Sequence, residues 1–357
     1  MTTKRPRTVV VKLGTSSVTG PDGKPDPELM RRVTDQVAEL VGRGVRCLIV
    51  SSGAVAAGMQ ALGLPRRPTD MPGLQAAASV GQRRLIDIYA ALLEGKGRLV
   101  GQILLTQDDM VQRRHYLNAK HTIDRLFDLG CIPIVNENDT VATEEIRYGD
   151  NDRLAALVAN LVAADLLIML SDVAGVFTSH PSNDGAELVE TVEEISPELM
   201  KAASGSSGLG SGGMASKLEA ARMATFSGVA VVIAAAARDS AVLDAYEGRS
   251  VGTYFKPRPS RVQARKLWIA WAQQSRGHVV VDEGAALALT KGNKSLLAAG
   301  VIQVEGTFKA GDAIEVLTED RQIVAKGLVG FDSGLLSDIA GTKGNREVIH
   351  RDHMVLM

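Results

Sequence analysis

Residues 8–17 read Thr-Val-Val-Val-Lys-Leu-Gly-Thr-Ser-Ser, a short apolar run that ends in a lysine and a polar turn. The apolar residues do not alternate with polar ones, which is typical of a parallel strand covered on both faces. A lysine at the end of a buried strand is costly unless an anion meets its ammonium group. We therefore expect Thr8–Lys12 to form a buried strand that brings Lys12 to an anionic ligand.

The same kind of apolar run recurs through the first two-thirds of the chain and alternates with segments of helical period. Repeated strand–helix units favour an α/β fold with an open, mainly parallel sheet and helices on both faces. An extended or hairpin segment is expected at Ala142–Tyr148. The expected strands are Thr8–Lys12, Arg46–Val50, Leu99–Leu105, Ile132–Val135, Leu166–Leu170 and Val229–Ala234. The expected helices are Pro27–Val41, Gly73–Leu93, Ala119–Leu129, Asn151–Ala163 and Gly212–Ser227.

The strand–helix pattern stops near Gly252, and Lys256–Lys266 then carries two prolines and five basic residues without an acid. Such a segment is typical of a domain boundary. We expect a first domain at residues 1–260, a linker at 261–277 and a small, mostly β domain at 278–357. One helix is expected in the second domain, at Glu283–Leu289.

Composition excludes several functional classes. The chain has 357 residues, 45% of them hydrophobic, a formal net charge of −1 and a pI near 6.6, so it has no general attraction to nucleic acid or acidic membranes. Cys47 and Cys131 have no metal-ligand spacing and suggest free thiols in a reducing compartment. Met1–Arg7 is followed by only a short apolar run, so neither a signal peptide nor a membrane span is expected. These features indicate a soluble cytoplasmic protein.

A glycine-rich loop with the sequence Ser-Gly-Ser-Ser-Gly-Leu-Gly-Ser-Gly-Gly-Met-Ala-Ser-Lys occupies Ser204–Lys217. Glycine allows consecutive amides to face one concavity, and the following helix start and Lys217 add positive charge, so the loop favours a polyphosphate. A flexible linker is the alternative, although a helix and a buried strand follow directly. Rossmann and Walker A patterns do not fit, because Ile233 stands where an acid is needed and no glycine precedes Lys217.

Polar clusters follow four of the expected strands: Lys12–Ser17, Ser51–Ala54, Asn136–Asp139 and Ser171–Asp172. Each cluster alone is ordinary turn chemistry. In a parallel sheet, however, the carboxyl ends of the strands share one edge, where ligands gather. The four clusters and the glycine loop therefore predict one common cleft.

Asp150, Asn151 and Asp152 precede or open a helix, where such residues act as N-caps. Two carboxylates near two lysines and a phosphate loop suggest a role in the site in addition to capping. They would either hold Mg²⁺ through water or fix the lysine ammonium groups. No Ser/His/Asp triad and no zinc-ligand spacing is present, so no dedicated metal site is expected.

The chain resembles the amino acid kinase family at these residues, and specifically its glutamate-phosphorylating branch. The C-terminal part resembles a PUA domain that starts near Val279–Ala285. The matching segments of the first part are Val9–Thr15, Val50–Ala54, Gln75–Gln82, Val135–Val141, Tyr148–Leu154, Leu170–Asp172 and Gly212–Lys217.

The resemblance implies ATP-dependent phosphorylation of the γ-carboxylate of L-glutamate, with Mg²⁺ on the nucleotide, as the first step of proline biosynthesis. It also implies feedback inhibition by proline and a homo-oligomer, either dimer or tetramer. By position, the catalytic residues are Lys12, Lys217 and Asp152. The glutamate-binding residues are Ser52, Asn136, Asp139, Asp150 and Asn151. The ATP-binding residues are Lys12, Ser171, Asp172, Ser211, Gly212, Gly213, Met214, Ala215, Ser216 and Lys217.

Two alternatives stay open. Another member of the same family would act on a different carboxylate, phosphate or carbamate, and the Asn136–Asp139 segment together with Asp150 and Asn151 argues against it. A PUA-like module also suggests an RNA-binding protein, but residues 278–357 hold eight lysines and arginines against eleven aspartates and glutamates. That balance opposes a surface that follows phosphates, so nucleic-acid binding is not expected.

Overall fold

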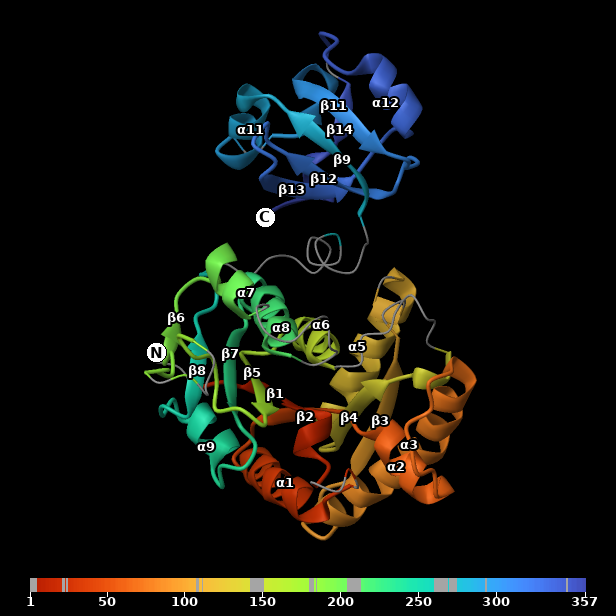
Figure 1. Cartoon of the computed structure of the whole chain (residues 1–357), viewed down its shortest axis with the longest axis vertical. Helices are drawn as coiled ribbons and strands as arrows, with labels where there is room; N and C mark the ends of the chain where they lie inside the picture. The colour runs from red at the N-terminus through yellow and green to blue at the C-terminus, as the bar shows by residue number, and fades with distance from the viewer. Residues whose placement is uncertain are drawn as a thin grey trace. The chain divides into compact units, whose positions relative to one another are not determined.

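The computed structural model (Figure 1) describes residues 5–20, 23, 25–106, 109–110, 112–141, 151–179, 183, 185–203, 213–259, 269, 275–292, 294–344 and 346–357. The chain divides into two compact units, Met1–Arg261 and Val262–Met357. Most of the expected linker at 261–277 lies outside the described residues, and the first described strand of the second unit begins at Ser275. Each unit is therefore treated by itself.

The first unit is built on an eight-stranded sheet with the order β3-β4-β2-β1-β5-β7-β8-β6. Six of its strands run parallel, which confirms the expected mainly parallel sheet; β8 runs antiparallel to β7, and β6 pairs in parallel with β8. The strands are β1 (Thr8–Leu13), β2 (Arg46–Ser51), β3 (Val100–Leu105), β4 (Ile132–Glu137), β5 (Leu166–Ser171), β6 (Thr191–Val192), β7 (Ala230–Ala235) and β8 (Gly252–Phe255).

Helices cover both faces of this sheet. In Figure 1, α1 and α9 lie on one side of the sheet and α6 and α8 on the other. Val9, Val11 and Leu13 of β1 join the core beneath α1, α3 and α9. Because side chains alternate along a strand, Lys12 points to the opposite face, toward α6 and α8. The helices are α1 (Pro27–Gly42), α2 (Ala54–Leu62), α3 (Met71–Glu94), α5 (Arg113–Asp128), α6 (Asp152–Leu161), α7 (Pro197–Ala203), α8 (Met214–Phe226) and α9 (Ala241–Tyr246).

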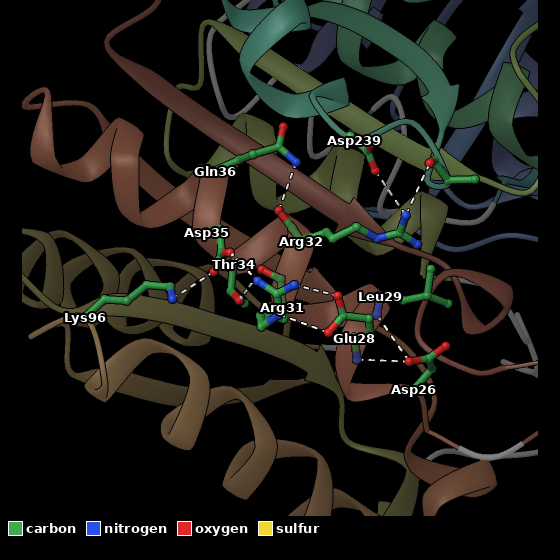
Figure 2. Close-up of polar contacts among 11 residues, drawn as sticks. Asp26, Glu28, Leu29, Arg31, Arg32, Thr34, Asp35, Gln36, Lys96 and Asp239 are labelled. Atoms are coloured by element: carbon green, nitrogen blue, oxygen red, sulfur yellow. Dashed lines mark hydrogen bonds and ion pairs between the residues drawn. The ribbon is translucent and has the colours of Figure 1, made fainter.

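Helix α1 is fixed at its start and along its side by polar contacts (Figure 2). Its N-cap Asp26 accepts hydrogen bonds from the backbone N–H groups of Glu28 and Leu29, as expected for a capping carboxylate. Gln36 donates to the carbonyl of Arg32 and accepts from the backbone N–H of Val242, at the start of α9. These contacts join the two helices on the face of β1 that Lys12 does not occupy.

Helix α2 is an element that the sequence pattern did not predict. It packs against α3 at two glycines: a Cβ atom on Gly58 would lie 1.7 Å from the carbonyl oxygen of Ala77, and one on Gly81 would lie 1.8 Å from that of Ala54. Helix α5 also begins earlier than expected, at Arg113. The extended segment expected at residues 142–148 lies outside the described residues.

The second unit is mostly β, as expected, and has its own apolar core. It contains the expected helix near Glu283–Leu289 and a second helix at Ser333–Ile339 that was not expected. Its five-stranded sheet has the order β11-β9-β12-β13-β15, beside a two-stranded sheet of β10 and β14. No helix among the described residues of the chain has the length and apolar character to cross a membrane. The elements are β9 (Ser275–Val281), α11 (Glu283–Thr290), β10 (Leu296–Leu297), β11 (Val301–Gly306), β12 (Ala313–Leu317), β13 (Ile323–Leu328), α12 (Ser333–Ile339), β14 (Glu347–Ile349) and β15 (Met354–Leu356).

Candidate active site

The carboxyl ends of four neighbouring parallel strands bring the predicted polar clusters to one edge of the sheet. Lys12 of β1 is in register with Val50 of β2 and with Met169 of β5, and Val50 pairs with Val135 of β4. The residues that follow these positions therefore emerge side by side. This convergence was expected from the sequence, because the carboxyl ends of parallel strands share one edge of the sheet.

Lys12 and Lys217 meet at a single carboxylate on this edge. The ammonium nitrogen of Lys12 lies 2.5 Å from one oxygen of Asp152, and that of Lys217 lies 3.1 Å from the other. All three side chains are buried. Both ammonium groups contact this carboxylate, which concentrates positive charge at this edge of the sheet. The cluster is therefore suited to an anionic ligand.

Three different elements place these groups. Lys12 is the fifth residue of β1, Asp152 is the first residue of α6, and Lys217 lies in the first turn of α8, whose N-cap is Gly213. Helices α6 and α8 pack against each other, and α6 also packs on β1. Two helix N-termini therefore face the same buried charges, and their dipoles favour an anion there.

An amide cluster lies next to the lysines. The side-chain N–H₂ of Asn151 donates to the side-chain oxygen of Asn136 at 2.6 Å and also to the carbonyl of Ser51. Asn136 in turn donates to the side-chain oxygen of Gln82 on α3, at 2.6 Å. Because Asn151 directly precedes Asp152, the amide cluster and the lysine cluster are covalently adjacent.

Gln82 is a site residue that sequence reasoning did not select. It ends the matching segment Gln75–Gln82, which was the available signal. Its position within a long helix gave no reason to single it out, because its contact with Asn136 depends on how α3 packs against the sheet.

A pocket of about 80 Å³ opens beside the amide cluster. It contains all four described residues that were predicted to bind the substrate. Gly53 precedes the pocket wall formed by α2 and has a φ of 101°, a conformation that favours glycine. The residues that line it are Thr15, Ser52, Gly53, Ala54, Val55, Ala56, Arg67, Asn136, Glu137, Asp139 and Asn151.

Two carboxyl groups in this pocket have raised pKa values. Burial raises the pKa of Glu137 to about 7, and the neighbouring carboxylate of Asp139 adds to that shift. Burial also raises the pKa of Asp139 to about 6, while the guanidinium of Arg67 acts in the opposite direction. Carboxylates in such surroundings are stabilised by a cation that enters the pocket.

The predicted nucleotide side is only partly described. Ser171 ends β5 in a buried position and donates a hydrogen bond to the side chain of Asp172 at 2.9 Å. Gly213 caps α8, and Met214, Ala215 and Ser216 form its first turn with Lys217. Asp150, Ser211, Gly212 and the preceding part of the glycine loop lie outside the described residues.

The described residues do not provide a protein-held metal centre, because no group of three His, Cys, Asp or Glu side chains lies close enough to hold an ion. Asp152 has both carboxylate oxygens in contact with lysines. Of the two roles considered for the acidic residues, this geometry favours orientation of the lysines by Asp152.

Comparison with known proteins assigns the two units to families. The amino acid kinase family matches residues 7–235, and the PUA domain matches residues 277–350. The chain belongs to the amino acid kinase family. It is 48% identical to the protein named Glutamate 5-kinase from Cutibacterium acnes, over 98% of this chain and 91% of that protein. It is 47% identical to the Glutamate 5-kinase from Nocardia farcinica, over 98% of this chain and 96% of that protein.

Solved structures show the same fold. Carbamate kinase from Giardia lamblia bound to AMP-PNP aligns with a TM-score of 0.52 and 17% identity, covering 71% of this chain and 99% of that one. UMP kinase from Bacillus anthracis aligns with a TM-score of 0.50 and 15% identity, covering 73% of this chain and 100% of that one. Their coverage corresponds to the size of the first unit. This chain is thus a kinase with an amino acid kinase fold and a C-terminal PUA domain.

Proposed function

We propose that this kinase transfers the γ-phosphoryl group of ATP to the γ-carboxylate of L-glutamate, the first step of proline biosynthesis. The observation that carries the proposal is the buried pair of lysines on Asp152, adjacent to a pocket that contains acidic, amide and hydroxyl side chains. The relatives named Glutamate 5-kinase, which match along 98% of the chain, support the same acceptor.

The proposed chemistry needs charge neutralisation more than covalent help. An oxygen of the γ-carboxylate attacks the γ-phosphorus, the bond from that phosphorus to the β–γ bridging oxygen breaks, and ADP leaves with the bond electrons. Both reactants are anionic, so Lys12 and Lys217 would offset their repulsion and stabilise the transferring group. Asp152 would hold the two ammonium groups in position, which favours in-line transfer.

The remaining residues would divide between the two substrates. Mg²⁺ would be carried by the nucleotide phosphates and would add further positive charge to them. Glutamate would be bound by Ser52, Asn136, Asp139, Asp150 and Asn151. ATP would be bound by Lys12, Ser171, Asp172 and the segment Ser211–Lys217.

An acceptor panel tests this proposal. ADP release is measured with L-glutamate, L-aspartate, N-acetyl-L-glutamate, carbamate and UMP, with hydroxylamine present to trap an acyl phosphate as its hydroxamate. Glutamate-dependent ADP release with formation of the γ-hydroxamate is the expected result. ADP release that depends on another acceptor would replace glutamate with that acceptor.

We further propose that proline inhibits the enzyme by entering the glutamate pocket. Proline keeps the α-carboxylate and α-nitrogen of glutamate but lacks the γ-carboxylate, so it would bind without reacting. The segment Val135–Gly149, part of which lies outside the described residues, would close over either ligand. Initial rates over a glutamate–proline grid would then show inhibition that glutamate relieves, and inhibition relieved only by ATP would reject the shared pocket.

We also propose a cytoplasmic homo-oligomer, a dimer or tetramer, which light scattering on the purified chain measures directly. The acidic balance of the PUA domain disfavours an RNA-binding role. We therefore expect a fluorescent single-stranded RNA to show no binding to the purified chain at low salt.

A further inference from the structure

Arg67 lines the candidate glutamate pocket, although nothing in the sequence pattern had selected it. It lies in the segment between α2 and α3, whereas Glu137 and Asp139 come from the end of β4 and the turn that follows. Arg67 is exposed to solvent, but it is close enough for its charge to lower the pKa of the Asp139 carboxyl against the effect of burial. The pocket therefore has a guanidinium and two carboxyl groups supplied by separate elements.

This arrangement is complementary to the α-carbon end of an amino acid. The γ-carboxylate of glutamate must face Lys12 and Lys217 for transfer to occur. The α-ammonium and the α-carboxylate then remain for the other groups of the pocket. Asp139 and Glu137 offer negative charge to the ammonium, and Arg67 offers a planar pair of N–H donors that matches a carboxylate.

We propose that Arg67 binds the α-carboxylate of the acceptor amino acid, and that Glu137 shares the binding of its α-ammonium with Asp139. This inference rests on the proposed function and adds two specificity residues to it. Together with the lysines, these groups recognise the three charges of glutamate separately. The raised pKa values of Glu137 and Asp139 show that Arg67 does not offset the burial of these two carboxyl groups, so an entering ammonium group would stabilise their charged forms.

Two analogues separate these contacts. 4-Aminobutyrate lacks the α-carboxylate of glutamate, and glutarate lacks its α-ammonium. Equilibrium dissociation constants for glutamate, 4-aminobutyrate and glutarate are measured by calorimetry on the wild-type chain, Arg67→Gln and Glu137→Gln. Arg66→Gln is the matched control, because this neighbouring arginine is also exposed but is not among the residues that line the pocket.

Arg67→Gln should raise the dissociation constants of glutamate and glutarate by roughly 10–100-fold, because a hydrogen bond to a charged group is lost. The dissociation constant of 4-aminobutyrate should stay unchanged. Glu137→Gln should weaken the binding of glutamate and 4-aminobutyrate, which carry the ammonium group, but not the binding of glutarate. Arg66→Gln should match the wild type for all three compounds. Equal losses for all three compounds in either variant would overturn the assignment for that residue.

Kinetics supply a second readout that does not need the analogues to bind. In Arg67→Gln the KM for glutamate should rise by roughly 10–100-fold with the KM for ATP unchanged, and Arg67→Lys should recover part of the loss. An unchanged glutamate KM in Arg67→Gln would reject the inference while the proposed function stands. A wild-type enzyme that releases no ADP with glutamate would instead reject the proposed function.

Discussion

At the scale of single residues, the site depends on one carboxylate. Asp152 contacts both lysines through different oxygens and is completely buried, so each ammonium group keeps a partner even if the other lysine is removed. Removal of Asp152 itself would leave two buried like charges side by side, which is far more damaging. The lysines are therefore the residues at which catalysis can be tested without loss of the fold.

Lys12→Ala and Lys217→Ala should each lower turnover by about 10²–10³, the usual effect of losing one donor that stabilises transition-state charge. The measurement is ADP release at saturating substrates, with circular dichroism and the melting temperature as checks on folding. Lys201→Ala, at an exposed lysine on α7, is the control and should keep wild-type turnover. Folded Lys12 or Lys217 variants with near-normal turnover would show that the lysines are misassigned.

Glu137 should make stability depend on pH. Its pKa in the folded chain, about 7, lies above the model-peptide value of 4.5, so the folded state binds more protons than the unfolded state between these values. Stability should therefore fall as pH rises from about 4.5 to about 7, and the destabilising contribution should be complete above that range.

Glu137→Gln should accordingly melt at a higher temperature than the wild type at pH 8 and at a similar temperature near pH 4.5, without glutamate. Each kcal/mol corresponds to roughly 2–4 °C for a domain of this size. Glu187→Gln, at an exposed glutamate, is the control and should not change the melting temperature. A Glu137→Gln curve parallel to the wild type at all pH values would contradict the burial of this charge.

At the scale of elements, the contact between α2 and α3 determines where the pocket wall stands. The first residues of α2 line the pocket, and the helix approaches α3 so closely that neither Gly58 nor Gly81 has room for a Cβ atom. The atoms in the way belong to the backbone, so a side chain there cannot be accommodated by a rotamer change. Any substitution must move a helix.

Gly81→Ala should therefore both destabilise the chain and weaken glutamate binding. A forced separation of packed elements costs about 1–3 kcal/mol, and the shift would displace Ala54 at the pocket. Urea denaturation and the glutamate KM measure the two effects. Ser79→Ala, at an exposed position on the same helix, should change neither quantity. A lower stability with an unchanged KM would mean that the movement does not reach the pocket.

The elements also show how far the sequence determines this fold. The six parallel strands were predicted within two residues at either end, because uninterrupted Val, Ile and Leu runs have few alternatives to a doubly covered strand. Helix α2 was missed because Ala54–Leu62 contains no charged residue and its helix period is weak. Strand β8 was missed because Gly252–Phe255 is only four residues long and begins with a glycine, which gives little strand signal.

The residues of the candidate site also divide into those that the sequence could predict and those that it could not. Residues at the carboxyl ends of strands, such as Lys12 and Asn136, were predictable because parallel strand ends share an edge. Gln82 and Arg67 were not, because a helix and a connecting segment reach the site only through tertiary packing. No property of the local sequence around these two residues reports that packing.

At the scale of the whole molecule, the two units have separate cores and separate sheets. Every described residue of the candidate site lies between Lys12 and Lys217, within the first unit. The amino acid kinase family matches residues 7–235, all of which belong to the first unit. We therefore expect phosphoryl transfer to require the first unit alone.

A chain that ends at Gln274, just before β9, should keep glutamate-dependent ADP release, with KM values for glutamate and ATP close to those of the full chain. The physical reason is that its sheet, its covering helices and its buried charges are complete without the PUA domain. Lys217→Ala in the shortened chain is the matched control and should abolish most of the remaining turnover. Circular dichroism and light scattering establish whether the shortened chain is folded and whether its assembly has changed. A folded shortened chain without turnover would show that the PUA domain contributes to the active conformation, and a changed assembly with normal turnover would confine its role to oligomerisation.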